Sequence, residues 1–185
     1  MFNIDLGDGA EIVLRDRSTD FGVHKLINGN LEHLREWEPW AHSDQSMISV
    51  ASLGTYLLTQ WVKGEAIPCV IRQDGQVAGA TTARINLYEK SATIGYWLGE
   101  AYEGRGLVTR AVSALLDTLF AEHDIARAII DTSVMNKRSR AVAERLGFTL
   151  EGTMRGAQAY PGERRDLVVY GLLREEWVAR SGREA

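Results

Sequence analysis

The chain of 185 residues is poor in the features that mark secreted, membrane-spanning or metal-binding proteins. Its single cysteine, Cys69, excludes an internal disulfide, and the strand-like apolar residues around it predict a buried thiol. No apolar run approaches the ~18 residues that a membrane-spanning helix needs. The acidic N-terminus lacks the basic start of a signal peptide. We therefore expect a cytoplasmic protein.

An excess of basic charge is also missing. The 21 Lys and Arg residues are outnumbered by 25 Asp and Glu, giving a formal net charge of −4, which argues against a dedicated nucleic-acid binder. Histidine, cysteine and carboxylate residues form no cluster with metal-ligand spacing, so we expect no metal. The hydrophobic content of 45% is ordinary for a soluble globular protein, and the length fits one domain over residues 1–185.

Hydrophobic periodicity and turn residues predict strands and helices in a mixed order. A strand at 10–17 precedes one or two short helices at 18–42, with Ser18 as the N-cap and Gly29 as a break. A helix is expected at 49–63. Residues 66–85 are expected to form a strand hairpin around Asp-Gly, and further strands are expected at 91–99, 126–134, 148–156 and 164–177. Two more helices are expected at 107–120 and 136–148, the second with Asn136 as its N-cap. This order indicates a mixed α/β sheet.

A glycine-rich turn precedes the most clearly periodic helix, in the sequence WLGEAYEGRGLVTRAV at 97–112. The first amides of a helix have no partner inside it, and the helix dipole favours an anion there. Gly104 and Gly106 would let a phosphate approach those amides, and Arg105 and Arg110 would add positive charge. The stretch fits neither a P-loop nor the dinucleotide pattern G-x-G-x-x-G, because it lacks the P-loop lysine and has Thr109 at the last glycine. A pyrophosphate held by backbone amides and a turn without a ligand both remain open.

Several segments of the sequence resemble the motifs of a known protein family. YEGRGLVTRAV resembles motif A of the GNAT superfamily of acetyl-CoA-dependent N-acetyltransferases, and NKRSRAVAERLGF resembles its motif B. LREWEPW, NKRS, LGFTLEG and YGLLREEW are similar to the RimJ/RimL branch of ribosomal-protein N-terminal acetyltransferases. The resemblance runs from about Ile12 to Trp177 and departs from motif A at Glu103 and Val108. It implies an α/β GNAT fold with a mostly antiparallel twisted sheet, a splay between two parallel strands, and flanking helices.

The resemblance also implies acetyl-CoA as co-substrate and a set of residues that bind it. Gly104 would shape the turn, Thr109 would add a hydroxyl, and the pyrophosphate would meet the backbone of Arg105, Gly106, Leu107 and Val108. Pantetheine would meet the backbone of Trp97, Leu98 and Gly99 and the side chain of Asn136, which fits equally as a plain helix cap. Lys137, Arg138 and Arg140 form a basic group. This group either contacts the ribose phosphate of the coenzyme or is a solvated basic face.

Acetyl transfer needs a neutral amine, a polarised carbonyl and a proton for the departing thiolate. Where many superfamily members carry a tyrosine, this sequence has Ala143, and the RimL branch instead implies Ser139 as the proton donor. The glutamate base of that branch corresponds to Gln158, which cannot accept a proton. The other candidates for a base are Glu163, Asp166 and, as an outsider, His42. We therefore take Ser139, Gln158 and Glu163 as the catalytic candidates.

The resemblance implies that the acceptor side is walled by four aromatic residues, Trp37, Trp40, Tyr88 and Tyr160. For Trp37 and Trp40, packing of the first helices onto the sheet is favoured over a role at the acceptor entrance. An α-amine with a pKa of ~8 is roughly a tenth neutral at pH 7, whereas lysine, with a pKa of ~10.4, is neutral to below roughly a thousandth. A missing base therefore favours a protein N-terminus, acetylated directly without an acetyl-enzyme. A small-molecule amine acceptor and an acyl-CoA-binding module with little turnover remain alternatives. Analogy with the branch suggests a homodimer.

Overall fold

The computed structural model describes residues 2–182. The strands are β1 (Asn3–Gly7), β2 (Ala10–Leu14), β3 (Ala66–Gln73), β4 (Gln76–Asn86), β5 (Ser91–Leu98), β6 (Arg127–Ser133), β7 (Thr149–Tyr160) and β8 (Glu163–Leu173). The helices are α1 (Asp20–Asn28), α2 (Leu31–Trp37), α3 (Met47–Val62), α4 (Leu107–Glu122), α5 (Lys137–Arg145) and α6 (Arg174–Ser181), with short 3-10 turns η1 (Pro39–His42) and η2 (Glu100–Tyr102).

All eight strands belong to one sheet in the order β1-β2-β3-β4-β5-β6-β8-β7. The pair β5–β6 is parallel, and the other neighbouring pairs are antiparallel. A parallel pair needs a crossover connection, and here α4 provides it. The predicted mixed α/β sheet, mostly antiparallel with one parallel pair, is confirmed.

The parallel strands pair only at their beginnings. Ser91, Ala92 and Thr93 of β5 lie opposite residues 127–129 of β6, and the pairing then stops. Beyond that point β5 keeps β4 as its neighbour through Leu98, whereas β6 keeps β8 through Ser133. The sheet therefore divides between β5 and β6, which is the expected splay.

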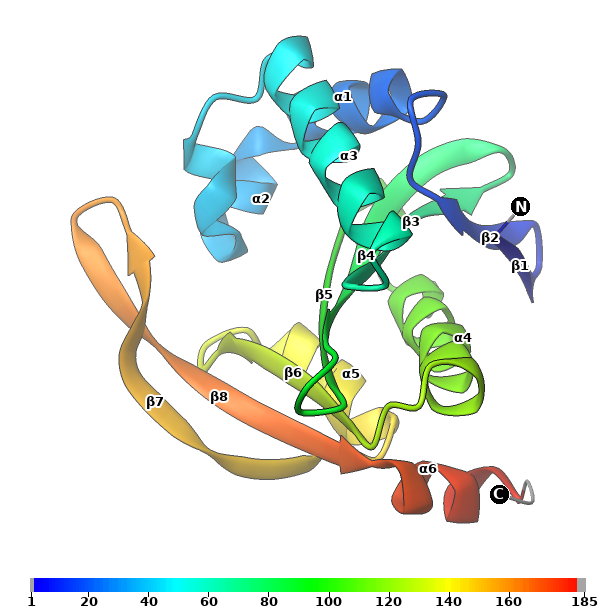
Figure 1. Cartoon of the computed structure of the whole chain (residues 1–185). Coiled ribbons are helices and arrows are strands. Elements are labelled where there is room, and N and C mark those ends of the chain that lie inside the picture. The colour runs from blue at the N-terminus through cyan, green and yellow to red at the C-terminus, as the bar shows by residue number, and fades with distance from the viewer. Residues whose placement is uncertain (1, 183–185) are drawn as a thin grey trace.

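Helices cover both faces of the sheet (Figure 1). In β3, Cys69 and Ile71 face the cluster that contains the α4 side chains, while Val70 between them faces the cluster formed with α1, α2 and α3. Because both faces are covered, β3 is apolar almost without interruption, as its sequence AIPCVIR shows. Cys69 is buried and free, as predicted.

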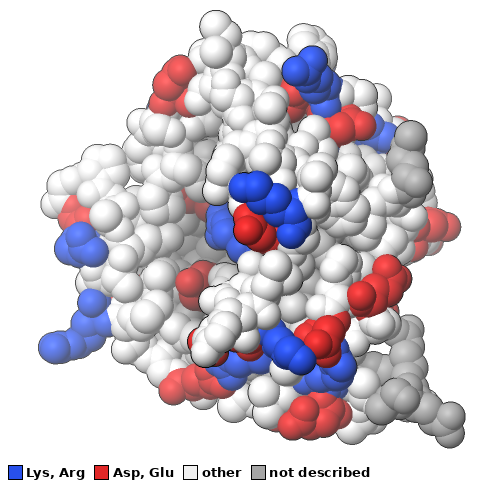
Figure 2. All heavy atoms as spheres, in the orientation of Figure 1, with Lys and Arg blue, Asp and Glu red and all other residues white. Residues whose placement is uncertain are grey.

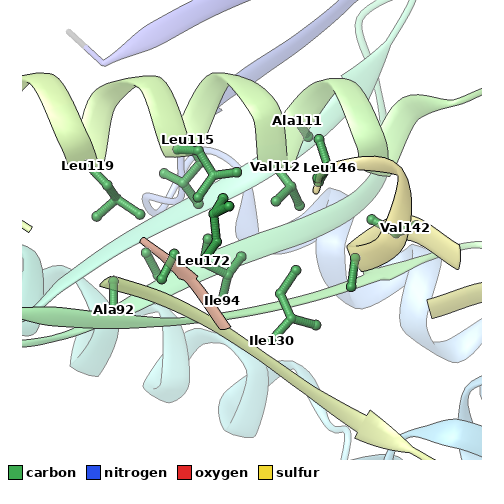
Figure 3. Packing of buried hydrophobic residues seen from close by; sticks show 14 of the residues in the cluster. Ala92, Ile94, Ala111, Val112, Leu115, Leu119, Ile130, Val142, Leu146 and Leu172 are labelled. Carbon is green, nitrogen blue, oxygen red and sulfur yellow. The ribbon is translucent and has the colours of Figure 1, made fainter. Parts of the chain in front are cut away.

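The larger core lies between α4 and the sheet. Leu115 and Leu119 of α4 point toward Ala92 and Ile94 of β5 and toward Leu172 of β8 (Figure 3). The stripe predicted from the periodicity of residues 107–120 is the buried face of this helix. Since α4 starts directly after the glycine turn, the core also fixes the position of that turn.

The structure corrects several predicted boundaries. The strand β1 was not predicted; it alternates exposed and half-buried residues at the edge of the sheet and so gives a weak apolar signal. The last strand ends at Leu173 rather than continuing to Trp177, because Glu176 accepts a hydrogen bond from the Leu173 amide (2.8 Å) and caps α6. Ser18 is not an N-cap: α1 follows Thr19, whose side chain makes no cap hydrogen bond.

Charged residues of both signs alternate over the face shown in Figure 2, without a broad region of positive charge. Within residues 2–182 no helix is both long and apolar enough to cross a membrane. In the same part of the chain, no group of three or more histidine, cysteine or carboxylate residues is arranged to hold a metal ion.

The first prediction concerns the core beneath α4. Leu115 is fully buried, so Leu115→Ala should lower the free energy of unfolding by about 2–5 kcal/mol, through lost apolar burial and the cavity left behind. Urea unfolding followed by circular dichroism measures this loss. The matched control is Leu87→Ala, since Leu87 is 59% exposed and should change stability little. Equal losses in the two variants would contradict this account of the core.

Candidate active site

A cavity of about 1510 Å³ follows the splay through the molecule. At one end it is lined by the turn before α4 and the first turn of α5. Its middle lies between β5 and β6, and its other end is enclosed by α2, η1, α3, β4 and β7. One continuous space therefore joins the glycine turn to the aromatic segment near residue 40.

The glycine turn presents a series of free backbone amides to this cavity. Gly104 (φ +74°) and Gly106 (φ +70°) adopt the left-handed conformation, and a side chain added at either would meet open space. The first helical bond of α4 runs from the Arg110 amide to the Gly106 carbonyl (3.0 Å). The amides of residues 104–109 have no acceptor among residues 2–182. Six consecutive free amides at a helix start fit an anion such as a pyrophosphate.

Glu103, the acidic residue at which the sequence departs from motif A, has its side chain engaged by two other residues. Glu103 lies 3.1 Å from Nε2 of His33 on α2, and its second oxygen pairs with the guanidinium of Arg138 on α5. Both partners also line the cavity. The negative charge of Glu103 is thus compensated, and the repulsion expected toward a pyrophosphate is reduced.

Two of the arginines near the turn point elsewhere. Arg110 donates to the carbonyls of Leu6 (3.0 Å) and Gly7 (2.9 Å) in the β1–β2 turn, so it holds that turn against α4 instead of adding charge for an anion. The guanidinium of Arg105 lies 5.8 Å from the centre of the Tyr102 ring. Thr109 lines the cavity and accepts a hydrogen bond from Arg145 (3.2 Å).

Three polar side chains meet in the splay. Asn136 caps α5 by accepting from the Ser139 amide (3.0 Å) and also lines the cavity, so the cap role is observed directly. The Ser139 hydroxyl lies 2.9 Å from the hydroxyl of Tyr96, which projects from the unpaired part of β5. Burial raises the pKa of Tyr96 to about 12, so its phenol stays protonated and can donate. A pair of hydroxyls therefore stands in the gap between the strands.

The far end of the cavity is an aromatic chamber. Trp40 and Trp97 lie with ring centres 5.7 Å apart, and Glu38 accepts a hydrogen bond from the Trp40 indole (2.7 Å). The Oε1 atom of Gln158 on β7 is buried without a hydrogen-bond partner among the described residues. Arg84 on β4 and Asp131 on β6 add charged groups to the lining.

The β7–β8 hairpin extends along the side of the molecule toward α2 (Figure 1), and Gln158 of β7 lines the chamber. Arg165 donates to the carbonyl of Glu36 at the end of α2 (2.6 Å), and its guanidinium lies 3.8 Å from the centre of the Tyr160 ring. The Tyr160 ring also meets His42 edge-on, with ring centres 6.1 Å apart. These contacts attach the hairpin to the α2–η1 segment.

Comparison with known proteins agrees with this geometry. Residues 13–149 match the family model of the acetyltransferase (GNAT) domain. The chain belongs to the GNAT acetyltransferase family. It is an N-acetyltransferase, and acetyl-CoA is its co-substrate. The family resemblance found in the sequence is confirmed.

Individual relatives of the acetyltransferase belong to the RimJ/RimL branch. YdaF of Bacillus subtilis (strain 168), a provisionally assigned ribosomal N-acetyltransferase, is 30% identical over 182 residues, 96% of this chain and 98% of that protein. The ribosomal-protein-serine acetyltransferase of Escherichia coli (strain K12) is 29% identical, covering 82% of this chain and 85% of the relative. The structure of RimL, a ribosomal L7/L12 alpha-N-protein acetyltransferase in complex with coenzyme A, superposes with a TM-score of 0.91 at 28% identity, over 95% of this chain and 99% of that one.

Of the three β5-end residues predicted to bind pantetheine through their backbone, two line the cavity and one does not. Trp97 and Leu98 line the cavity of the acetyltransferase. Gly99 does not: its amide donates to the Ala78 carbonyl (2.9 Å) and its carbonyl accepts from the Tyr102 amide (2.9 Å). Both backbone groups of Gly99 are therefore used within the protein, which corrects the expectation that they contact the cofactor.

The three basic residues predicted to form one group on α5 also have different positions. Lys137 and Arg138 line the cavity, whereas Arg140 donates to the Tyr170 hydroxyl (3.1 Å) and to the Val134 carbonyl (3.2 Å). Arg140 thus anchors α5 to β8 and to the residue that follows β6. It is not part of a free basic face.

Of the predicted acceptor residues, Trp37 and Trp40 line the cavity, while Tyr160 packs at its margin. Tyr88 does not reach it: the residue lies in the β4–β5 turn and is 92% exposed. Its aromatic type suggested a wall, but the turn carries it beyond the end of the sheet. The expectation for Tyr88 is therefore wrong.

The predicted catalytic residues are only partly brought together. Ser139 and Gln158 line the cavity, but Glu163 sits at the hairpin tip, half-exposed and paired with Arg165 (2.6 Å). Asp166 accepts from the Gly156 amide (2.7 Å) and His42 lies near the Arg35 carbonyl (3.1 Å); both stand outside the cavity lining. Their local partners explain why none of the three faces the splay.

Sequence reasoning missed two residues of the chamber. Tyr96 belongs to the alternating strand that was predicted, and its position opposite Ser139 required the splay to be known. Glu38 stands before a proline, between α2 and η1, and the residue before a proline avoids helical conformation. That Glu-Pro pair was the available signal that the carboxylate leaves the helix surface.

The second prediction tests the glycine turn. Leucine at Gly106 or at Gly75 of the β3–β4 turn would face the same strain, because both have φ near +70° with open space around them. Each of Gly106→Leu and Gly75→Leu should lose about 1–2 kcal/mol of stability. Only Gly106→Leu should weaken coenzyme A binding, by about tenfold or more, measured by calorimetry. Equal coenzyme A affinity in the two variants would show that the free amides of the glycine turn do not bind the coenzyme.

Proposed function

We propose that this acetyltransferase modifies the α-amino group of a protein N-terminus, with a ribosomal protein as the acceptor. The observation that carries the proposal is the single cavity that joins the free amides of residues 104–109, the hydroxyl pair in the splay and the aromatic chamber. The Escherichia coli relative and RimL are named as acetyltransferases of ribosomal proteins, which supports the acceptor class.

In this proposal the free amides of the turn hold the pyrophosphate of acetyl-CoA. The thioester arm lies in the splay, beside the cavity-lining residues Trp97, Leu98 and Asn136. From Ile94 onward β5 has no partner on the β6 side, so its backbone is available to the amides of pantetheine, as an edge strand is to a peptide. Lys137 and Arg138 stand where the phosphorylated end of the coenzyme would enter.

Ser139 is the proposed proton donor to the departing sulfur. Its hydroxyl lies in the gap itself, and the protonated phenol of Tyr96 holds it in place. The reaction is a direct transfer in which the acceptor nitrogen attacks the thioester carbonyl. The thiol of Cys69 takes no part, since it is buried in β3 and burial raises its pKa far above the usual range.

Three broader expectations complete the proposal. We take residues 1–185 as one acetyltransferase domain located in the cytoplasm. By analogy with the RimJ/RimL branch, we expect a homodimer in solution, which light scattering coupled to size exclusion measures directly.

The acceptor class is tested with acetyl-CoA and two matched short peptides of the same sequence, which begins with serine and contains one lysine. One peptide has a free N-terminus and the other an acetylated N-terminus. We expect thiol release only with the first. Acetylation of the lysine in the second peptide, or of small amines alone, would show the alternative acceptor classes. Coenzyme binding without thiol release from any amine would show the binding module.

The third prediction concerns Ser139. Ser139→Ala should lower kcat by about 10²-fold, because the departing thiolate loses its proton donor. The dissociation constant of coenzyme A should barely change, and Tyr96 keeps an acceptor in the Ser139 carbonyl (3.2 Å). Steady-state kinetics and calorimetry measure the two effects. Ser113→Ala, on α4 outside the cavity, is the control. A fully active Ser139→Ala enzyme would remove Ser139 from the mechanism.

A further inference from the structure

The acceptor chamber contains a carboxylate that the branch resemblance does not assign. Glu38 joins α2 to η1 in extended conformation (φ −116°, ψ 103°), and Pro39 begins η1. This local geometry turns its side chain into the cavity, where Trp40 donates to Oε2. The Oε1 atom makes no hydrogen bond within residues 2–182, so it remains available to a ligand.

Charged and titratable groups from four strands face Glu38. Arg84 on β4 favours its charge, whereas Asp131 on β6 opposes it. Tyr96 on β5 and Tyr160 on β7 both have pKa values raised in part by the charge of Glu38. The charge of Glu38 therefore acts both on Tyr96 in the splay and on Tyr160 in the hairpin.

Burial gives Glu38 the proton affinity of a base. Desolvation raises its pKa to about 7, although the Trp40 hydrogen bond and Arg84 both act in the opposite direction. A carboxylate with such a pKa is charged for half of the time at neutral pH and binds a proton strongly enough to take part in transfer.

The other acids around the cavity do not serve as well. Glu103 is paired with His33 and Arg138 at the opposite end, beside the glycine turn. Asp131 lines the cavity but is exposed to water rather than enclosed in the chamber. Gln158 occupies the position where the branch is expected to carry a glutamate, and its amide cannot take up a proton.

We infer that Glu38 is the general base that removes a proton from the acceptor amine. This inference rests on the proposed function. The buried and unpartnered Oε1 of Gln158 then accepts a hydrogen bond from the same ammonium group and orients it. The base stands at the junction of α2 and η1 in this chain, whereas Gln158 stands on β7.

The proton balance is complete. The acceptor enters as an ammonium ion and gives one proton to Glu38, and its neutral nitrogen bonds to the thioester carbonyl carbon. When the carbon–sulfur bond breaks, the sulfur takes a proton from Ser139, which recovers one as the nitrogen loses its second proton. Glu38 then releases its proton to water. The sum is an amide, a free thiol and one proton.

This base also selects the class of amine. Transfer from an α-ammonium with a pKa of ~8 to Glu38 is uphill by about one pKa unit, whereas transfer from a lysine with a pKa of ~10.4 is uphill by more than three. The difference corresponds to a population of the neutral amine about 10²-fold larger for the α-amine. The chamber chemistry therefore favours N-termini over lysine side chains.

The fourth prediction compares Glu38→Gln with Glu36→Gln. Glutamine at 38 still accepts the Trp40 hydrogen bond, and Glu36 is an exposed neighbour in α2 whose side chain faces away from the cavity. With a peptide that has a free N-terminal serine, Glu38→Gln should lower kcat about 10²-fold at neutral pH, with coenzyme A affinity unchanged. Glu36→Gln should behave like the wild type.

The pH dependence gives a second readout. Deprotonated Glu38 is the active form, so wild-type kcat/KM should rise with pH through about 7, and the limb due to Glu38 should vanish in Glu38→Gln. The variant should recover activity only as the acceptor itself loses its proton at higher pH. A variant that keeps both the wild-type rate and the wild-type profile would overturn the assignment.

A measurement without any acceptor separates this inference from the acceptor assignment. Because Glu38 is bonded to the Trp40 indole, tryptophan fluorescence should titrate near pH 7 in the wild type and in Glu36→Gln, but not in Glu38→Gln. Slow hydrolysis of acetyl-CoA by water should also depend on Glu38. If no peptide is acetylated but both dependences appear, the acceptor proposal fails and the base stands. If either dependence is missing, Glu38 is not the base.

Discussion

The site depends on the early end of the pairing between β5 and β6. Strands of a twisted sheet rotate relative to their neighbours, and here β5 follows β4 while β6 follows β8 after residue 93. The separation leaves one side of β5 without a strand partner, a cost that a bound chain with amide groups can offset. It also opens the space in which Tyr96 and Ser139 meet. Without the division, the same residues would form an ordinary closed sheet.

The charged residues around the cavity are distributed by function. At the end beside the glycine turn, backbone amides are free, and the acid in the turn, Glu103, is paired with side chains from α2 and α5. At the acceptor end, a carboxylate is kept largely out of water and held by an indole. Because each end has its own polarity, the proposed sites for the pyrophosphate and the ammonium group lie at opposite ends of one cavity.

The sequence was sufficient where a signal is local. The periodicity of α4, the Asp-Gly hairpin and the glycine turn each depend on neighbouring residues, and all three are present. The roles of Glu38 and Arg110 depend on burial and on partners far along the chain, which spacing alone cannot reveal. Glu163 illustrates the converse: it was close to the expected position in sequence, but hairpin pairing carried it to the tip, beside Arg165.

The contact between Arg110 and the β1–β2 turn has a consequence for the coenzyme. Arg110 belongs to the first turn of α4, and its guanidinium is held by two carbonyls near residue 7. The N-terminal hairpin thereby supports the helix whose leading amides form the proposed pyrophosphate site, although no residue of β1 or β2 lines the cavity. Changes at the beginning of the chain can thus reach the cofactor through the orientation of a single helix.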